Sequence, residues 1–498
     1  MGQKNIERIR GPRVYQWVRR MGLFLLGLVC LYLLLLIPEP GPGEINSPEG
    51  EPFVWGQDQV WDRLESRFLK ARQMGCDAAA ASRSAALNGL EASVAELGDR
   101  AGNLPSDDPL LTSLEERLFE TSAAVAACPE DGAERLLALH GQMRAHLKRA
   151  SVEWDLEGPD RARLYRLLYG GRMAVEEVLL QLPAQKMPVV FESAAPTPST
   201  APSVVLRGVR VHSGDILLSR GGAPTSALIA RGNDHPGNFS HVALVHVSEE
   251  GGFETIEAHI ESGVMVAGAE KYTGDPKLRI MLLRLREGLG DPHAAAAKAV
   301  AQARGRHIDY DFAMDHEDPT RLFCSEVASS VYREQGVELW KGLTTMSSPT
   351  TARWLSAFGV RHFTTHGPSD LEYDPQITVV AEWRDPSTLF KDHLDDAVID
   401  AMLEFADEHG QEVGHAALML PVARLVKVVS WAQNMMGGPG IIPKGMSPTT
   451  ALRAKWLDAR HEAIAAQVRA EALTFETEEG YKPPYWRLLA MARRAAAR

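Results

Sequence analysis

Cysteine is scarce in this chain, with four residues among 498. The low count excludes disulfide-framework proteins, which hold a small secreted chain together with dense cross-links. Positive charge is also in the minority, because 53 Lys and Arg stand against 65 Asp and Glu and leave a formal charge of −12. Nucleic-acid-binding domains usually carry a basic stripe. We therefore expect no nucleic-acid partner.

Several common catalytic motifs are missing. The chain has no G-x-S-x-G nucleophile elbow, which argues against a serine hydrolase of that type. It has neither a G-x-G-x-x-G loop nor a Walker motif, so nothing supports a nucleotide-binding role. Four histidines cluster in the middle of the chain, but their spacing fits no familiar zinc motif: His235, His241, His246 and His259. We predict neither a bound metal nor another cofactor.

One long hydrophobic run has no charged residue. It covers residues 21–37 and is near the lower limit of about 17 residues for a membrane-spanning helix. Residues 38–51 contain no Lys or Arg, whereas six basic residues precede the run: Lys4, Arg8, Arg10, Arg13, Arg19 and Arg20. The positive-inside rule therefore predicts a cytoplasmic basic segment at 1–20, a transmembrane anchor at 21–37, and the remainder across the membrane.

A cleaved signal peptide is the alternative to an anchor. The segment after the run is rich in Pro and Glu and lacks a small-x-small cleavage site, which favours an uncleaved anchor. We therefore expect a single-pass protein of the bacterial inner membrane, with its N-terminus in the cytoplasm and its bulk in the periplasm.

Two linkers divide the next part of the chain. Residues 38–56 are rich in Pro and Gly, and residues 186–204 include the Pro-rich stretch SAAPTPSTAPS. Between them, residues 57–185 show apolar residues three and four positions apart, the spacing of amphipathic helices. We predict an antiparallel helical bundle that serves as a spacer or docks a protein partner. The bundle contains Cys76 and Cys128, whose pairing the sequence leaves open.

The pattern changes over residues 205–365 to short β-rich runs with glycine-containing breaks. SEEGGF between two of these runs predicts a hairpin, and helices are expected near 291–305 and 323–335. Residues 366–498 are predicted to be mostly helical. Within them, LMLPVARLVKVVSWAQNMM is apolar nearly all round, and we expect a buried helix rather than a second membrane span. The predicted fold class is α+β.

A cysteine and a histidine stand out as candidates for catalysis. Cys324 lies where a predicted loop or strand changes into a helix, and the N-terminus of a helix stabilises a thiolate. A cysteine nucleophile also needs a base, and His241 begins an apolar strand just after a polar turn. The next strand offers Glu257, His259 and Glu261 on one face, by the two-residue period, as partners for the second imidazole nitrogen.

Five short motifs follow one another in a fixed order: Gly214-Asp215-Ile216, Ser240-His241, Ile256-Glu257-Ala258, Tyr310-Asp311 and Cys324-Ser325-Glu326. With these motifs, residues 205–345 resemble the circularly permuted NlpC-type papain-like family, and particularly its YiiX/YebB-like bacterial branch. The resemblance implies a permuted papain-like domain in which the histidine strand precedes the cysteine helix. A transmembrane helix and a helical bundle would precede that domain, and a mostly helical C-terminal region would follow it.

The resemblance also implies roles for single residues. Cys324 is the expected nucleophile and His241 its base. Glu257 is the expected third member, which orients the imidazole, and His259 is the runner-up for that place. The residues expected to line the site are Tyr310 and Ser240.

The expected function is that of a membrane-anchored, periplasm-facing thiol hydrolase. It would cleave amide or peptide bonds through an acyl-enzyme on Cys324, and the resemblance implies cell-wall peptides or other small amides as substrates. Two alternatives stay open. Permuted relatives include lipid acyltransferases and phospholipases, and the anchor would hold the site near a bilayer. The second alternative is that the papain-like unit is a non-catalytic binding scaffold. It is suggested by the helical regions, which occupy most of the chain.

Overall fold

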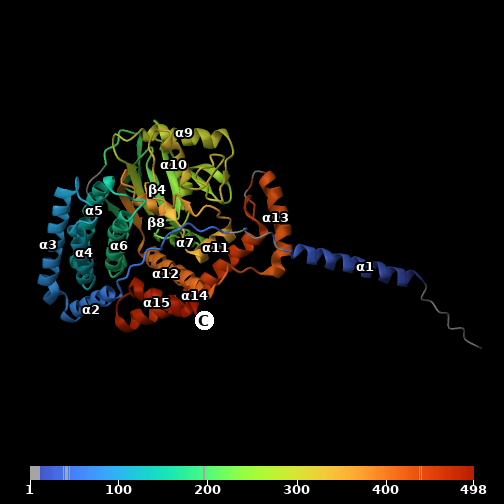
Figure 1. Ribbon diagram of the computed structural model, residues 1–498, viewed down its shortest axis with the longest axis horizontal. Helices are drawn as coiled ribbons and strands as arrows, with labels where there is room; N and C mark the ends of the chain where they lie inside the picture. The colour runs from blue at the N-terminus through green and yellow to red at the C-terminus, as the bar shows by residue number, and fades with distance from the viewer. Residues whose placement is uncertain are drawn as a thin grey trace, which may run out of the picture.

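The computed structural model describes residues 12–37, 39, 43, 45–193, 197–436, 438 and 440–498. Helix α1 (Pro12–Leu35) contains most of the hydrophobic run. It is the one helix in these described ranges that is long and apolar enough to cross a membrane, and it extends away from the body of the molecule (Figure 1). Part of each predicted linker and the basic residues Lys4, Arg8 and Arg10 lie outside the described residues.

Five helices follow α1 and pack around a core rich in leucine, and Figure 1 shows α3, α4, α5 and α6 side by side with α2 across one end of them. Local sequence sets their ends, as at α4, where Pro109 takes the first position and the Asp108 side chain accepts a 2.9 Å hydrogen bond from the Leu110 N–H. A disulfide joins Cys76, at the start of α3, to Cys128, just after α4. The five helices are α2 (Asp58–Met74), α3 (Cys76–Arg100), α4 (Pro109–Ala126), α5 (Ala133–Ala150) and α6 (Asp160–Leu180).

A seven-stranded antiparallel sheet lies at the centre, in the order β1-β13-β8-β4-β5-β6-β7. Side chains alternate across it, so Val242 and Leu244 of β5 join one apolar cluster, whereas Ala243 and Val245 join the other. The strands are β1 (Val190–Glu192), β4 (Ile216–Gly221), β5 (His241–Val247), β6 (Phe253–His259), β7 (Gly263–Gly268), β8 (Lys277–Leu285) and β13 (Ile377–Arg384).

Short helices and strands surround this sheet. The predicted hairpin joins β5 to β6, and α9 and α10 pack against β5. The helices are α7 (Pro224–Arg231), α8 (Ala269–Gly274), α9 (Pro292–Gly305), α10 (Glu326–Arg333) and α11 (Pro349–Phe358). The small strands are β2 (Ser203–Leu206), β3 (Val209–His212), β9 (Asp309–Tyr310), β10 (Arg321–Leu322), β11 (Thr344–Thr345) and β12 (Thr364–Thr365).

The C-terminal region is helical, and α12 (Pro386–His409), α14 (Pro448–Glu479) and α15 (Tyr485–Ala496) share one apolar core. Helical regions therefore flank a β-rich domain, which confirms the predicted α+β fold class. The prediction of a buried helix at α13 (Leu420–Met435) is wrong. Leu425 and Val429 are exposed, because α13 lies at the edge of the C-terminal region, beside the end of α1.

Buried ion pairs connect the bundle, the sheet and the C-terminal helices. Glu176 of α6 is fully buried and accepts hydrogen bonds of 2.8 and 3.0 Å from Arg279 on β8. His393 Nε2 on α12 lies 2.9 Å from the same carboxylate, and Arg384 Nε on β13 lies 3.2 Å from it. Burial alone raises the pKa of a carboxyl group, but Arg279, His393 and Arg384 hold the pKa of Glu176 well below its usual value.

The buried position of Glu176 generates a prediction about stability. Replacing it by Ala leaves the charges of Arg279, Arg384 and His393 buried without their shared partner, so Glu176→Ala is expected to lower the free energy of unfolding by about 3 kcal/mol or more. Urea unfolding followed by circular dichroism measures the change. Glu478→Ala on the exposed side of α14 is the control, and equal stability of the two variants would contradict the prediction.

Candidate active site

His241 is the first residue of β5, between β4 and β6. The strand starts here because the preceding residue, Ser240, already donates its N–H to the Ser219 carbonyl of β4 at 3.0 Å, and His241 then pairs with Ser219. β6 lies on the other side and pairs Glu257 with Ala243. His259 is two residues after Glu257 and is the last residue of β6, where it pairs with Gly263 of β7.

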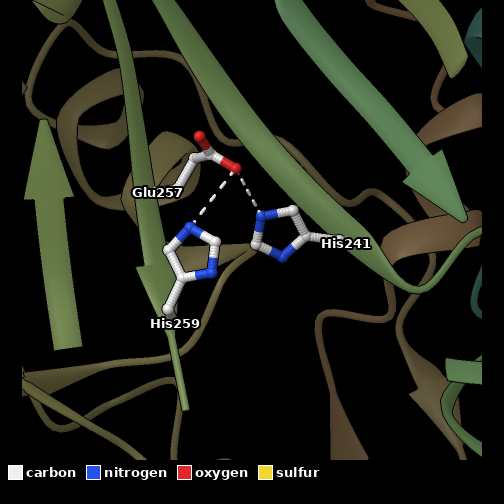
Figure 2. A group of neighbouring side chains, drawn as sticks. All are labelled: His241, Glu257 and His259. Atoms are coloured by element: carbon white, nitrogen blue, oxygen red, sulfur yellow. Dashed lines mark hydrogen bonds and ion pairs between the residues drawn. The ribbon is translucent and has the colours of Figure 1, made fainter. Parts of the chain in front are cut away.

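Glu257 lies between the two histidines (Figure 2). Its Oε2 atom is 2.9 Å from His241 Nε2 and 3.5 Å from His259 Nε2. The other oxygen, Oε1, accepts a 2.7 Å hydrogen bond from the hydroxyl of Thr255. Glu257 is only 3% exposed, so protein groups rather than bulk water hold its carboxylate in position.

Charge in this cluster is set by burial and by these contacts. Burial raises the pKa of Glu257, but the hydrogen bonds from His241 and His259 outweigh it and bring the pKa well below its usual value. Burial lowers the pKa of His241, whereas its interactions with Cys324 and Glu257 raise it, to about 9 overall. At neutral pH the pair is therefore a carboxylate and an imidazolium.

Cys324 lies between β10 and α10, at the start of the helix as the sequence predicts, and is buried. Its interaction with His241, together with that of Glu257, raises the pKa of the imidazole. Glu257 occupies Nε2 of the ring, and Figure 2 shows the second ring nitrogen pointing away from Glu257. That second nitrogen, Nδ1, is therefore the one available to the thiol.

Glu326, in the first turn of α10, stands two residues after Cys324. Its carboxyl accepts a 2.9 Å hydrogen bond from the Phe323 N–H and is 3% exposed. Burial raises its pKa to about 9, although the Phe323 hydrogen bond acts in the opposite direction. The group is consequently neutral at pH 7, so it adds no negative charge beside the sulfur.

Tyr310 and Ser240, the two other predicted site residues, occupy different places. Tyr310 on β9 lines a cleft of about 1330 Å³ together with His259. Burial and the neighbouring Cys324 keep the pKa of Tyr310 well above its usual value, so its hydroxyl stays neutral. Ser240 is 6% exposed, and its hydroxyl hydrogen bonds to Ser226 of α7. It fixes α7 to the start of β5 rather than lining the cleft.

The two acidic residues of the flanking motifs are structural. Asp215 accepts hydrogen bonds of 2.7 and 2.8 Å from Arg284 and one of 2.7 Å from the His212 N–H. Asp311 accepts from the N–H groups that follow it in the turn after β9. The sequence analysis missed Thr255, although its position two residues before Glu257 places it on the same face of β6.

His241, Glu257 and His259 also have the geometry of a candidate metal site. Their ligand atoms lie within 4.8 Å of one another, and theirs is the one such group of three His, Cys, Asp or Glu among the described residues. Both Nε2 atoms already contact one carboxylate oxygen. The three side chains are therefore joined through this one carboxylate oxygen.

Residues 210–381 match the family described as permuted papain-like amidase enzyme, YaeF/YiiX, C92 family. These residues form a permuted papain-like domain. The predicted resemblance is confirmed, and the match runs beyond residue 345 into β13, the strand that pairs with β8.

One solved structure is also similar to part of this chain. It is titled "Crystal structure of metalloprotein yiiX from Escherichia coli O157:H7, DUF1105". The likeness covers 34% of this chain and 97% of that one, with 20% sequence identity and a TM-score of 0.28. No curated protein matches the chain.

The carboxylate of Glu257 generates a prediction about His241. Glu257→Gln keeps the shape but removes the charge that favours the imidazolium, so the pKa of His241 is expected to fall from about 9 toward its ordinary value of 6.5. NMR of protein labelled at the histidine nitrogens measures the titration. Glu254→Gln, on the same strand but beside His246, is the matched control and leaves His241 unchanged. An unchanged His241 titration in Glu257→Gln would contradict the assignment.

Proposed function

We propose that the permuted papain-like domain is a thiol hydrolase that cleaves amide bonds through an acyl-enzyme on Cys324. The proposal is supported by the 2.9 Å contact of His241 Nε2 with Glu257 and by the interaction with Cys324 that helps to raise the pKa of His241. A papain-like amidase family supplies the reaction class. Cell-wall peptides and other small amides are the proposed substrates, as the sequence analysis expects.

The first half of the reaction forms the acyl-enzyme. The Cys324 thiolate attacks the carbonyl carbon of the amide and forms a C–S bond. The Cys324 N–H makes no hydrogen bond within the described chain, so it can donate to the oxyanion. The His241 imidazolium then gives its Nδ1 proton to the leaving nitrogen, and the C–N bond breaks.

The second half restores the enzyme. Neutral His241 takes a proton from a water molecule, whose oxygen attacks the thioester carbon. The C–S bond breaks, the acid product leaves, and the thiolate–imidazolium pair is formed again. Throughout, Glu257 holds the ring by Nε2, and Thr255 holds Glu257. We propose His259 as a second positioning residue, since it contacts the same Glu257 oxygen.

The proposed place of this reaction is the periplasmic side of the bacterial inner membrane. Helix α1 is the proposed single-pass anchor, with the N-terminus in the cytoplasm. The disulfide between Cys76 and Cys128 supports this orientation, because such bonds persist in the oxidising periplasm and are rare in the cytoplasm.

Loss of the nucleophile tests the reaction. Cys324→Ala is expected to lower the turnover of muropeptides or γ-glutamyl amides at least about a thousandfold, because the acyl-enzyme needs the sulfur. Cys30→Ala changes the other free cysteine, which is exposed on α1, and is the control expected to keep full turnover. Unchanged turnover in Cys324→Ala would reject the thiol mechanism.

The same experiment distinguishes two alternative functions, a lipid acyltransferase or phospholipase and a non-catalytic scaffold. Transfer of an acyl group from phospholipid to Cys324, detected as added mass, would favour a lipid acyltransferase or phospholipase. Absence of any adduct or turnover would favour a non-catalytic scaffold, a function compatible with the large helical share of the chain.

The compartment is tested by counting the free thiols of the protein taken from whole cells. Maleimide–polyethylene glycol added after denaturation without reductant is expected to label two cysteines, Cys30 and Cys324, because Cys76 and Cys128 are paired. With reductant the number rises to four. A double variant, Cys76→Ala with Cys128→Ala, shows two labels in both conditions. Four labels without reductant would indicate a reducing compartment and contradict the periplasmic orientation.

A further inference from the structure

Helix α13 presents an apolar surface that nothing in the described chain covers. Its inner side buries Leu420, Ala423 and Ser430, whereas large apolar side chains face outward. Trp431 is 62% exposed and Met436 is 80% exposed. The other members of this outer face are Leu418, Met419, Val422, Leu425, Val428, Val429, Met435 and Ile441. An exposed apolar patch of this extent marks a binding surface rather than ordinary protein surface.

The outer face of α13 continues from the end of α1. The Tyr32 hydroxyl of α1 donates a 2.9 Å hydrogen bond to the Leu418 carbonyl, just before α13. Arg424 of α13 donates to the Leu35 carbonyl at 3.0 Å and also to the Ile37 carbonyl, at the C-terminal end of α1. Figure 1 shows α13 lying across the base of α1. If α1 spans the bilayer, α13 is therefore at the level where α1 leaves it.

Charge around the outer face of α13 is compatible with a lipid surface. Residues 413–457 contain no Asp or Glu. The two cations of α13 itself make contacts within the protein, because Arg424 donates to the end of α1 and Lys427 donates to the carbonyls of Pro443 and Lys444. The outer face itself is therefore apolar, with a tryptophan of the kind enriched at membrane interfaces.

A cleft beside the proposed active site reaches this same helix. Its lining includes His259, which contacts Glu257, and Tyr310 at one end, and Trp431, Asn434 and Met435 of α13, whereas Cys324 and His241 are not part of it. Its volume of about 1330 Å³ exceeds the roughly 300–1,000 Å³ of ordinary small-molecule pockets. An apolar chain bound beside His259 can therefore extend along this cleft to the outer face of α13.

We propose that the outer face of α13 lies in the periplasmic surface of the bilayer and that the cleft takes amphiphilic, lipid-linked amides from that surface. This inference rests on the proposed anchor and thiol hydrolase. Burial of the outer face in the lipid removes its apolar area from water. It also fixes the orientation of the rest of the protein relative to α1, so that the cleft opens next to the membrane.

The position of α13 is tested by spin labels on the full chain. Leu425→Cys and Val429→Cys, each in a Cys30→Ala background with Cys324→Ala, are labelled and placed in vesicles of phosphatidylethanolamine and phosphatidylglycerol. Oxygen is expected to relax both labels more than a water-soluble nickel complex does. Glu478→Cys on α14 is the control and favours nickel. Preference for nickel at 425 and 429 would overturn the proposal, and shielding from both reagents would indicate a protein partner instead.

The substrate class is tested by activity in the same vesicles. One fluorogenic peptide amide is compared with its hexadecyl-linked form. Val429→Asp is expected to lower turnover of the lipid-linked form at least fivefold and to leave the soluble form unchanged, since Val429 does not line the cleft. Val205→Asp, at an exposed position of β2, is the matched control and is expected to change the turnover of neither form. Equal turnover of the lipid-linked form in both variants would overturn the substrate class, whereas no turnover by the wild type would reject the hydrolase itself.

Discussion

The buried carboxylates of α6 and α12 hold the sheet in place, and the geometry of the site depends on them. Arg220 of β4 is fully buried and pairs with Asp392 and Asp396 of α12. The neighbouring residue on β4, Ser219, pairs with His241 at the start of β5. Because an unpaired buried arginine is very unfavourable, β4 cannot lie as it does without α12. Helix α12 is therefore part of the structural support of the sheet.

Within the site, the same physical principle is used in two directions. Burial disfavours charge on every ionisable group, and only specific partners restore it. Glu257 has two histidines and Thr255 as partners and remains a carboxylate, whereas Glu326 has only one backbone N–H and becomes neutral. The negative charge of Glu257 thus lies beside the His241 imidazole, whereas Glu326 places no negative charge near the Cys324 sulfur. This distribution favours the charged imidazolium form of His241.

Much of the central domain was predictable because its signals are local. The hairpin after β5, the capped start of α9 at Asp291 and the motif around Cys324 each depend on a few adjacent residues. Contacts between distant segments were not predictable, such as Glu176 with Arg279, since neither residue's neighbours in sequence indicate a partner. The helix α13 was predicted to be buried because apolar residues all round usually mean a protein core. Its place beside α1 depends on tertiary packing.

The central claim is that His241 activates Cys324, and alkylation of Cys324 tests it most directly. Iodoacetamide at pH 7, with the modified peptide quantified by mass spectrometry, gives the rate for this one cysteine. The account predicts that Cys324 in the wild type reacts at least about tenfold faster than in His241→Ala, because the imidazolium that stabilises the thiolate is lost. Equal rates in the two proteins would show that His241 does not activate the sulfur and would contradict the account.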